Sequence, residues 1–150
     1  MQKNILITFI LFVLIFSSCK KEEKASLSPT IEFLEISPSI AAELEDEIIL
    51  KIKYTDENGD LGENDSEVKN LFVLDTRNGV EYSFRVQQLA PTGAEIAIEG
   101  QLSINIKTMV ITDESSEQLA TFSVYMYDRA KNKSNTISTT LITILKNETN

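Results

Sequence analysis

Apolar and polar residues alternate along most of the chain, and this pattern constrains the fold more than any other feature. Between residues 47 and 55, the apolar side chains at the even positions share one face, whereas Lys51 and Lys53 share the other. A period of two predicts half-buried strands, because successive side chains of a strand point to opposite faces. Further strands are predicted at 31–36, 71–74, 80–87, 102–107, 119–127 and 136–145.

About seven strands with short connections predict an all-β fold, and specifically an immunoglobulin-like antiparallel β-sandwich over residues 30–146, followed by a tail at 147–150. The chain has no tryptophan and one cysteine, so the core tryptophan and disulfide of antibody domains are excluded. An up-and-down barrel is the alternative, although seven uneven strands close poorly.

Two glycines predict turns or bulges in the strand pattern. Asn78-Gly79 separates two strand patterns, which predicts a hairpin with a type I′ turn and positive φ at both central residues. Gly100 lies between residues 95–99 and 101–107, where it indicates a bulge or a turn.

The composition excludes several kinds of chemistry. The absence of histidine excludes Ser-His-Asp and Cys-His nucleophiles and any metal site that needs imidazole. One cysteine excludes an internal disulfide and a thiolate metal cluster. With 14 Lys and Arg against 23 Asp and Glu, the formal charge of −9 argues against nucleic acid as a partner.

The first 18 residues predict a signal peptide. Lys3 precedes a run over residues 5–16 that is apolar apart from Thr8, and twelve residues of helix span only about 18 Å, too short for a bilayer core. Ser17 and Ser18 before Cys19 resemble the lipobox of bacterial lipoproteins. That resemblance implies a mature chain that begins at a lipidated Cys19 and is anchored to the membrane through its acyl chains. The alternative is that Cys19 is an incidental thiol behind an ordinary signal sequence.

Residues 19–29 form a charged, apolar-poor tether after the lipidated cysteine. Its Lys-Lys-Glu-Glu-Lys segment at 20–24 resembles the export signal that directs Bacteroidetes lipoproteins to the outer face of the outer membrane. The resemblance implies a location in the outer membrane, at the cell surface. The alternative is a plain linker, with the protein held at the periplasmic face.

An acidic loop after the strand at 47–55 predicts a metal site. Asp56, Asn58 and Asp60 follow an i, i+2, i+4 spacing in a loop bent by glycines, which can turn several oxygens toward a hard cation such as calcium. Leu61 stands where an EF-hand requires glycine, so an EF-hand is excluded. The alternative is a solvated turn, because turns favour the same residue types.

A second polar loop, residues 127–135, is predicted to meet the first one. In immunoglobulin-like order, the loops after residues 47–55 and 119–127 emerge at the same end of the sandwich. The alternative is that the basic residues of this loop, Arg129, Lys131 and Lys133, neutralise the acidic loop directly. The predicted calcium ligands are Asp56, Asn58, Asp60, Asp128 and Asn132.

These two segments carry a family resemblance. Asp-x-Asn-Gly-Asp-Leu-Gly at 56–62 and Tyr-x-Tyr-Asp-Arg-Ala-x-Asn-x-Ser-Asn at 125–135 resemble the paired signatures of small Ig-like lipoproteins in Bacteroidetes. Asn58 stands where that family usually has aspartate, which lowers the ligand charge, and Lys131 stands where glycine is common. The resemblance implies the fold and the cellular location, because these relatives mostly have no assigned activity.

The sequence predicts a non-catalytic, lipid-anchored surface module that binds a protein or a glycan and is stabilised by calcium. The alternative is an accessory structural subunit of an outer-membrane complex that docks through a sheet face, with Tyr125 and Tyr127 as an aromatic surface. A hydrolase that uses carboxylates such as Asp56 and Asp128 is less favoured, because so small a domain has little room for a deep, dry cleft.

Overall fold

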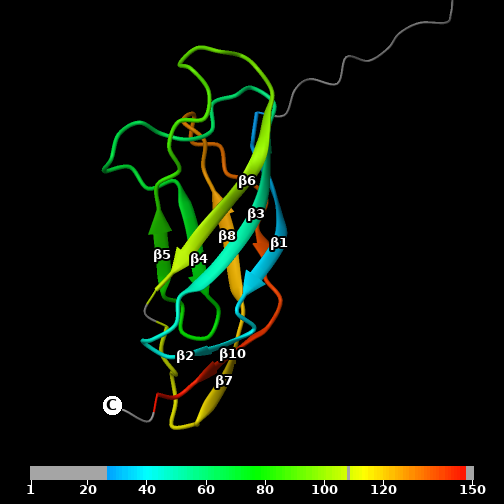
Figure 1. Ribbon diagram of the computed structural model, residues 1–150. Helices are drawn as coiled ribbons and strands as arrows, with labels where there is room; N and C mark the ends of the chain where they lie inside the picture. Colours follow the sequence, from blue (N-terminus) through cyan, green and yellow to red (C-terminus); the bar gives the residue numbers. More distant parts are fainter. Residues whose placement is uncertain (1–26, 108, 148–150) are drawn as a thin grey trace, which may run out of the picture.

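The computed structural model describes residues 27–107 and 109–147, and this part of the chain is all-β, as predicted (Figure 1). The predicted signal peptide, Cys19 and most of the tether lie outside the described residues. Within these residues, no helix is long and apolar enough to cross a membrane. The strands are β1 (Thr30–Ser37), β2 (Ile40–Ala42), β3 (Ile48–Asp56), β4 (Leu71–Asp75), β5 (Glu81–Phe84), β6 (Ile98–Ile106), β7 (Glu117–Ala120), β8 (Phe122–Met126), β9 (Ile137–Ser138) and β10 (Ile142–Leu145).

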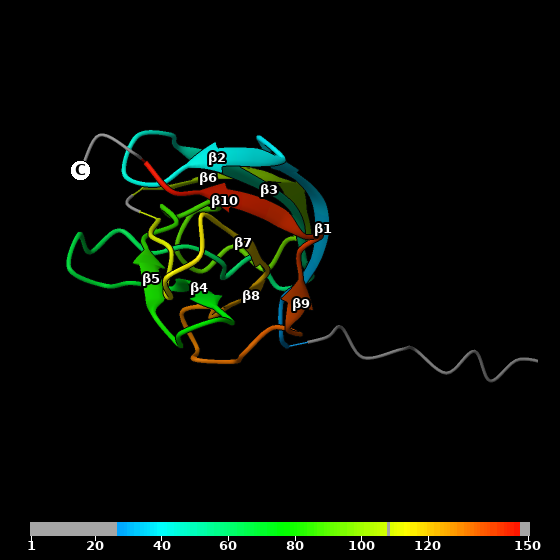
Figure 2. The ribbon, with the colours of Figure 1, turned by 90° about the horizontal axis from the view of Figure 1, so that it is seen from below.

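The strands form three sheets, in the orders β1-β3-β6, β5-β4-β8-β9 and β2-β10-β7. All neighbours are antiparallel except β2 and β10, which are parallel. Figure 2 shows β1, β3 and β6 on one side of the molecule and β5, β4 and β8 on the other. Because only Thr121 separates β7 from β8, the second and third sheets share one long chain segment.

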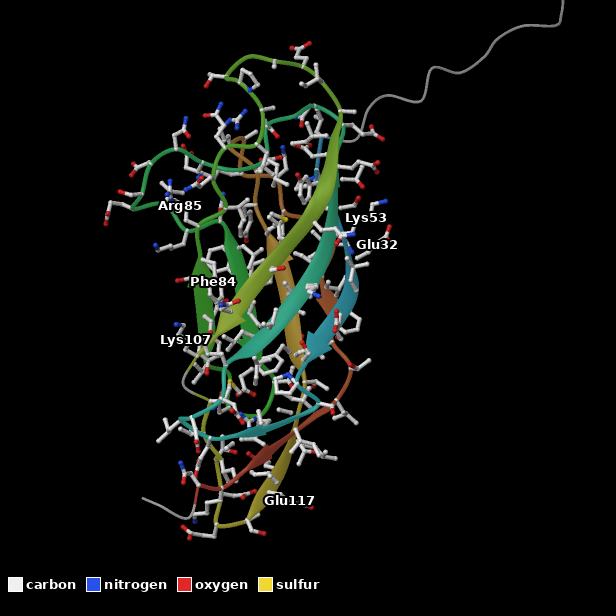
Figure 3. All side chains as sticks on the ribbon, viewed as in Figure 1. Glu32, Lys53, Phe84, Arg85, Lys107 and Glu117 are labelled. Atoms are coloured by element: carbon white, nitrogen blue, oxygen red, sulfur yellow. The ribbon has the colours of Figure 1, made fainter. Side chains whose placement is uncertain are left out.

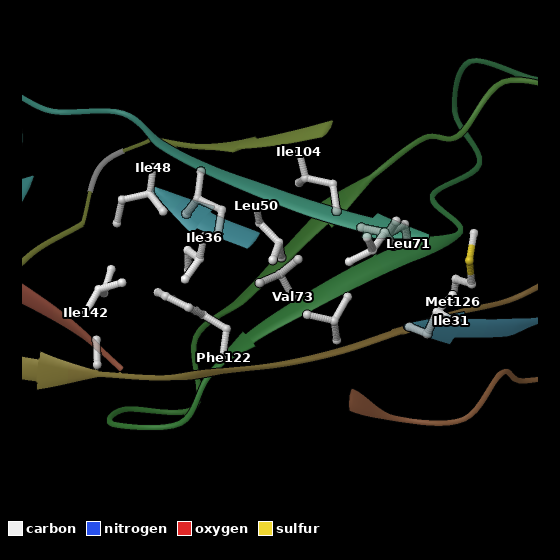
Figure 4. Close-up of a cluster of buried hydrophobic side chains, with 14 of the residues drawn as sticks. Ile31, Ile36, Ile48, Leu50, Leu71, Val73, Ile104, Phe122, Met126 and Ile142 are labelled. Carbon is white, nitrogen blue, oxygen red and sulfur yellow. The ribbon is translucent and has the colours of Figure 1, made fainter. Parts of the chain in front are cut away.

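The core lies between these layers and is built from the alternating residues that the sequence pattern selects. Ile48, Leu50 and Ile52 of β3 are fully buried. Figure 4 shows Ile48 and Leu50 facing Val73 and Phe122 of the opposite layer. Complete burial of one such aliphatic side chain stabilises the folded state by about 1.5–3 kcal/mol. The predicted period of two is therefore confirmed.

The strand boundaries differ from the prediction in two of the later strands. The segments 119–127 and 136–145 were expected to be continuous, but each is interrupted. At the interruption, the Thr139 hydroxyl accepts a hydrogen bond from the Phe122 amide at 3.0 Å, and the Thr76 hydroxyl donates to the Thr121 carbonyl at 2.9 Å. Threonine side chains thus bond to the backbone at these positions beside the backbone bonds that remain, which a residue-type pattern does not reveal.

The hairpin between β4 and β5 is confirmed, but its predicted type I′ turn is wrong. Gly79 has a φ of 75°, whereas Asn78 is not at positive φ. The buried Asp75 carboxylate accepts hydrogen bonds from the Arg77 amide at 3.0 Å and from the Arg77 guanidinium at 2.7 Å. This local pairing lengthens the loop to residues 76–79, which the Gly79 amide closes by donating to the Asp75 carbonyl at 2.9 Å.

The prediction of a bulge or turn at Gly100 is also wrong. Gly100 lies within β6, opposite Tyr54 of β3, and the register continues through it without a shift. A side chain at this position would overlap the Tyr54 ring. Gly100 therefore allows close approach of an aromatic ring, which is the other common reason for a glycine inside a strand.

The two ends of the molecule differ in character. At the end where β1 begins, the polar loops after β3 and β8 lie together (Figure 1). At the opposite end, Ile40 and Leu119 both flank Thr143 on the outer face of the β2-β10-β7 sheet, and they are 57% and 59% exposed. Leu141 and Leu145 of the same region are exposed as well, so this face is apolar.

Candidate functional site: the loops after β3 and β8

The two polar loops contact each other, as the predicted strand order requires. The Arg129 amide donates to the Asp60 carbonyl at 3.1 Å. The Arg129 guanidinium donates to the carbonyl of Gly62 at 3.1 Å and to that of Gly59 at 3.2 Å, with a longer contact to Leu61 at 3.4 Å. Arg129 therefore holds the acidic loop by its backbone, and its charge lies beside the acidic side chains.

The acidic loop is anchored in the core by Leu61. This side chain is fully buried, and its amide donates to Asp56 Oδ2 at 2.8 Å. Gly59 and Gly62 have φ values of 70° and 86°, and a Cβ at either position would overlap backbone atoms of the 87–96 segment. In the Asn-Gly-Asp-Leu-Gly segment, the leucine inserts into the core. The two glycines that flank it adopt positive φ in places where a side chain would not fit.

Three oxygens of this loop are buried without a hydrogen-bond partner in the structure. They are Oδ1 of Asp56, Oδ1 of Asn58 and Oδ1 of Asp60. Asp56 as a whole is only 1% exposed. Buried polar atoms nearly always have a partner, so three unpartnered oxygens spaced two residues apart indicate an incomplete site. All three belong to the predicted calcium ligands.

The charges around the site favour binding of a cation. Burial is the main factor that raises the pKa of Asp60, and the nearby Asp128 and Asp56 carboxylates raise it further. Arg129 and Asn58 lower it, but the net direction is upward. Asp60 is therefore harder to ionise than an isolated aspartate, because burial and the nearby negative charges both disfavour its charged form.

The other two predicted ligands, Asp128 and Asn132, are bonded to each other. Asp128 is 2% exposed, and its two oxygens accept hydrogen bonds from the Asn132 amide and from Asn132 Nδ2, both at 2.8 Å. Asn132 Nδ2 also donates to the Leu27 carbonyl at 2.8 Å. Lys131 between them has a φ of 69°, a conformation that glycine adopts more easily. Asp128 and Asn132 therefore have an evident structural role.

Two residues of this second loop outside the predicted ligand set also form hydrogen bonds that hold it in place. Asn135 brackets β1, because its Oδ1 accepts from the Ile31 amide and its Nδ2 donates to the Ile31 carbonyl, both at 2.8 Å. The Ser134 hydroxyl accepts from the Met126 amide at 3.0 Å. The Asn-x-Ser-Asn part of the motif therefore fixes the first strand and the end of β8, and its only sequence signal is the motif itself.

The described residues contain no group of three or more histidine, cysteine, aspartate or glutamate side chains placed to hold a metal ion. An ion at this loop would therefore combine carboxylates with the Asn58 amide oxygen and water. A cavity of about 550 Å³ opens beside Asn58, Asp60 and Arg129, with Glu57 and Glu95 also on its wall. The residues present fit calcium chemically, because every candidate donor is a hard oxygen.

The basic residues of the second loop do not act alike. Arg129 reaches the acidic loop, whereas Lys133 Nζ lies 3.8 Å from the centre of the Tyr125 ring. Tyr125 stacks on Phe72 at 5.2 Å, and Tyr127 meets both rings edge-on. The Tyr125 hydroxyl donates to Glu81 at 2.7 Å, and this bond to the carboxylate is the main cause that raises the pKa of Tyr125 to about 12. The predicted aromatic surface is therefore a set of partly buried rings packed on one another.

Comparisons with known proteins give no match. A scan against protein-family models finds no family, and searches of curated proteins and of solved structures find no similar protein. The function of this chain is therefore inferred from its own residues and geometry.

Proposed function

We propose that this protein is a non-catalytic, lipid-anchored module of the bacterial outer membrane, exposed at the cell surface, with an immunoglobulin-like fold stabilised by calcium. The sheet orders β1-β3-β6 and β5-β4-β8-β9 support this fold, because they match an A-B-E sheet facing a C′-C-F-G sheet. The parallel pairing of β2 with β10 matches a first strand that crosses to the second sheet.

The observation that carries the calcium proposal is the set of three unpartnered buried oxygens on Asp56, Asn58 and Asp60. A hard, oxygen-coordinated ion is favoured by the two-residue spacing of these oxygens along the loop, by the Asp128 carboxylate nearby and by the absence of histidine. A bound ion would satisfy the oxygens and offset the repulsion between the acidic side chains. It would also stiffen the end of the domain from which the tether leaves, because Asn132 joins Asp128 to Leu27.

Calcium binding can be measured directly on the purified protein by isothermal titration calorimetry. We expect one site, a dissociation constant in the range from micromolar to millimolar, and binding that weakens as the pH falls, because the pKa of Asp60 is raised and protons compete with calcium for this carboxylate. The Asp113→Asn variant is the control, because this carboxyl lies in a loop before β7, away from the site. The absence of a calcium heat at millimolar concentration would contradict the proposal.

The lipid anchor is tested at Cys19. In cells fed labelled palmitate, the wild-type chain is expected to incorporate label and to sediment with membranes, whereas Cys19→Ala is expected to do neither. The change removes all acyl chains, and each buried methylene contributes about 0.8 kcal/mol to membrane anchoring. Protease treatment of intact cells distinguishes the cell surface from the periplasmic face. Label that remains on Cys19→Ala would show that this cysteine is not the lipidated residue.

The proposed role in binding is supported by the apolar face at the end opposite the tether. A protein partner fits this face better than a glycan does, because Ile40, Leu119 and Leu141 offer aliphatic contacts and few hydrogen-bonding groups. A module anchored at one end and apolar at the other is arranged to hold a partner away from the membrane.

A further inference from the structure

One long edge of the β1-β3-β6 sheet is open. β6 pairs with β3 along its whole length from Ile98 to Ile106 without a register shift. No strand pairs with its other side among residues 27–107 and 109–147 (Figure 1). Alternate residues of an antiparallel strand direct their N–H and C=O groups to each side, so β6 presents a row of unused backbone groups.

The other strand edges are protected in ways that β6 is not. β1 is bulged between Phe33 and Glu35, and Pro38 follows its end. β2, β5, β7 and β9 have at most four residues each, whereas β6 has nine. Bulges, prolines and short strands are the usual means by which proteins prevent edge-to-edge pairing. β6 has no bulge and no proline, which indicates that its edge is used.

An apolar groove of about 490 Å³ runs beside the middle of β6. Its walls include Phe84, Leu89, Leu102 and Ile104. Figure 3 shows Phe84 and Arg85 on the side of β6 away from β3. The segment after β5 does not close the groove, because it bonds to the acidic loop instead: the Leu89 amide donates to the Leu61 carbonyl at 3.3 Å.

The solvent side of β6 is self-complementary. Its exposed residues are, in order, Glu99, Gln101, Ser103 and Asn105, and the exposed Lys107 follows directly after its end at Ile106. If two copies pair antiparallel about a twofold axis at Ser103, each Glu99 faces the partner's Lys107 and each Gln101 faces the partner's Asn105. On the core side, Leu102 faces the partner's Ile104. Opposite charges at facing positions stabilise antiparallel pairs, and the twofold axis doubles the effect.

We propose that β6 pairs with β6 of a second copy of this chain, which joins two β1-β3-β6 sheets into one continuous sheet. The charges at its ends are available for this pairing. The Glu99 side chain is 70% exposed in its ion pair with Lys53, and the Lys107 side chain is 66% exposed in its ion pair with Glu47. The pairing is independent of calcium, because β6 contributes no residue to the loops after β3 and β8.

Cysteine cross-linking of the full-length chain tests the register. In Ser103→Cys, the two new thiols face each other across the axis at the spacing a disulfide requires, and mild oxidation is expected to give a dimer on non-reducing gels. In Gln101→Cys, the two thiols lie about 13 Å apart along the strands and are expected not to join. The wild-type chain is the control for any disulfide that forms through Cys19. Equal dimer yields from Ser103→Cys and Gln101→Cys would overturn the proposal.

A charge exchange tests the same interface without cysteines, by sedimentation of the full-length protein. Glu99→Lys places like charges opposite each other twice and is expected to weaken the dimer about tenfold. The double variant Glu99→Lys with Lys107→Glu is expected to restore it. Lys53→Gln breaks the Glu99 ion pair within one copy and is expected to leave the dimer intact. A monomer in every variant and in the wild type, or pairing only with an added peptide, would contradict pairing between copies.

Discussion

Replacing Leu61 with alanine is expected to lower the free energy of unfolding by about 2–5 kcal/mol. Leu61 is fully buried, although it belongs to a loop that is otherwise polar. Its removal leaves a cavity where the acidic loop enters the core. Urea unfolding followed by circular dichroism measures the change, and an unaltered slope would show that the folded and unfolded states remain comparable.

Leu119→Ala is the matched control, because the same side chain is 59% exposed on the outer face of β7. We expect a change below about 0.5 kcal/mol for this variant. Leu61→Ala is also expected to weaken calcium binding, because the buried side chain fixes the position of the backbone amide that donates to Asp56. Equal stabilities of Leu61→Ala and the wild type would show that the loop does not depend on its leucine.

The Asp60→Asn variant is expected to be more stable than the wild type in chelator and less stable in calcium. In the calcium-free protein, the pKa of Asp60 is raised above 3.8 in the folded state. Its contribution to stability is therefore present below pH 3.8 and is lost as the pH rises through the folded-state pKa, so that at pH 7 the charged side chain destabilises the fold. Asparagine removes that charge and leaves a neutral amide oxygen, which is a weaker calcium ligand than a carboxylate.

Calcium reverses the order because it binds the folded wild type only. At a concentration 100 times its dissociation constant, it adds about 2.7 kcal/mol to the free energy of unfolding, and Asp60→Asn is expected to lose most of this gain. The unfolding temperatures of both proteins, in calcium and in chelator, measure the reversal. Asp113→Asn is expected to keep the full calcium response. The same order of stabilities in both conditions would show that Asp60 is not a ligand.

The candidate site was only partly predictable from the sequence. The residues Asp56, Asn58 and Asp60 were selected by their spacing, which is a local property of one loop. The contact of Arg129 with the carbonyls of that loop was not predictable in detail, because it joins residues about 70 positions apart. The pairing of Asn135 with Ile31 likewise joins residues 104 positions apart.

The predictions at Asn78-Gly79 and at Gly100 were wrong for a similar physical reason. Asn78-Gly79 is typical of a type I′ turn, but the buried pair of Asp75 and Arg77 imposes a longer loop. Gly100 is typical of a bulge, but the ring of Tyr54 on the neighbouring strand explains it. In both cases a side chain outside the short motif decides the backbone conformation.

The alternation of apolar residues by itself determined that the described part of the chain is all-β and which side of each strand faces the core, because burial of one face of a strand depends only on a period of two. Tertiary structure alone decided which strand edges are paired, which oxygens of the polar loops keep a partner, and how the first strand is fixed. These depend on contacts between residues far apart in the chain. The open edge of β6 is the clearest example, because its sequence alternates like that of its neighbours and only the sheet order leaves it exposed.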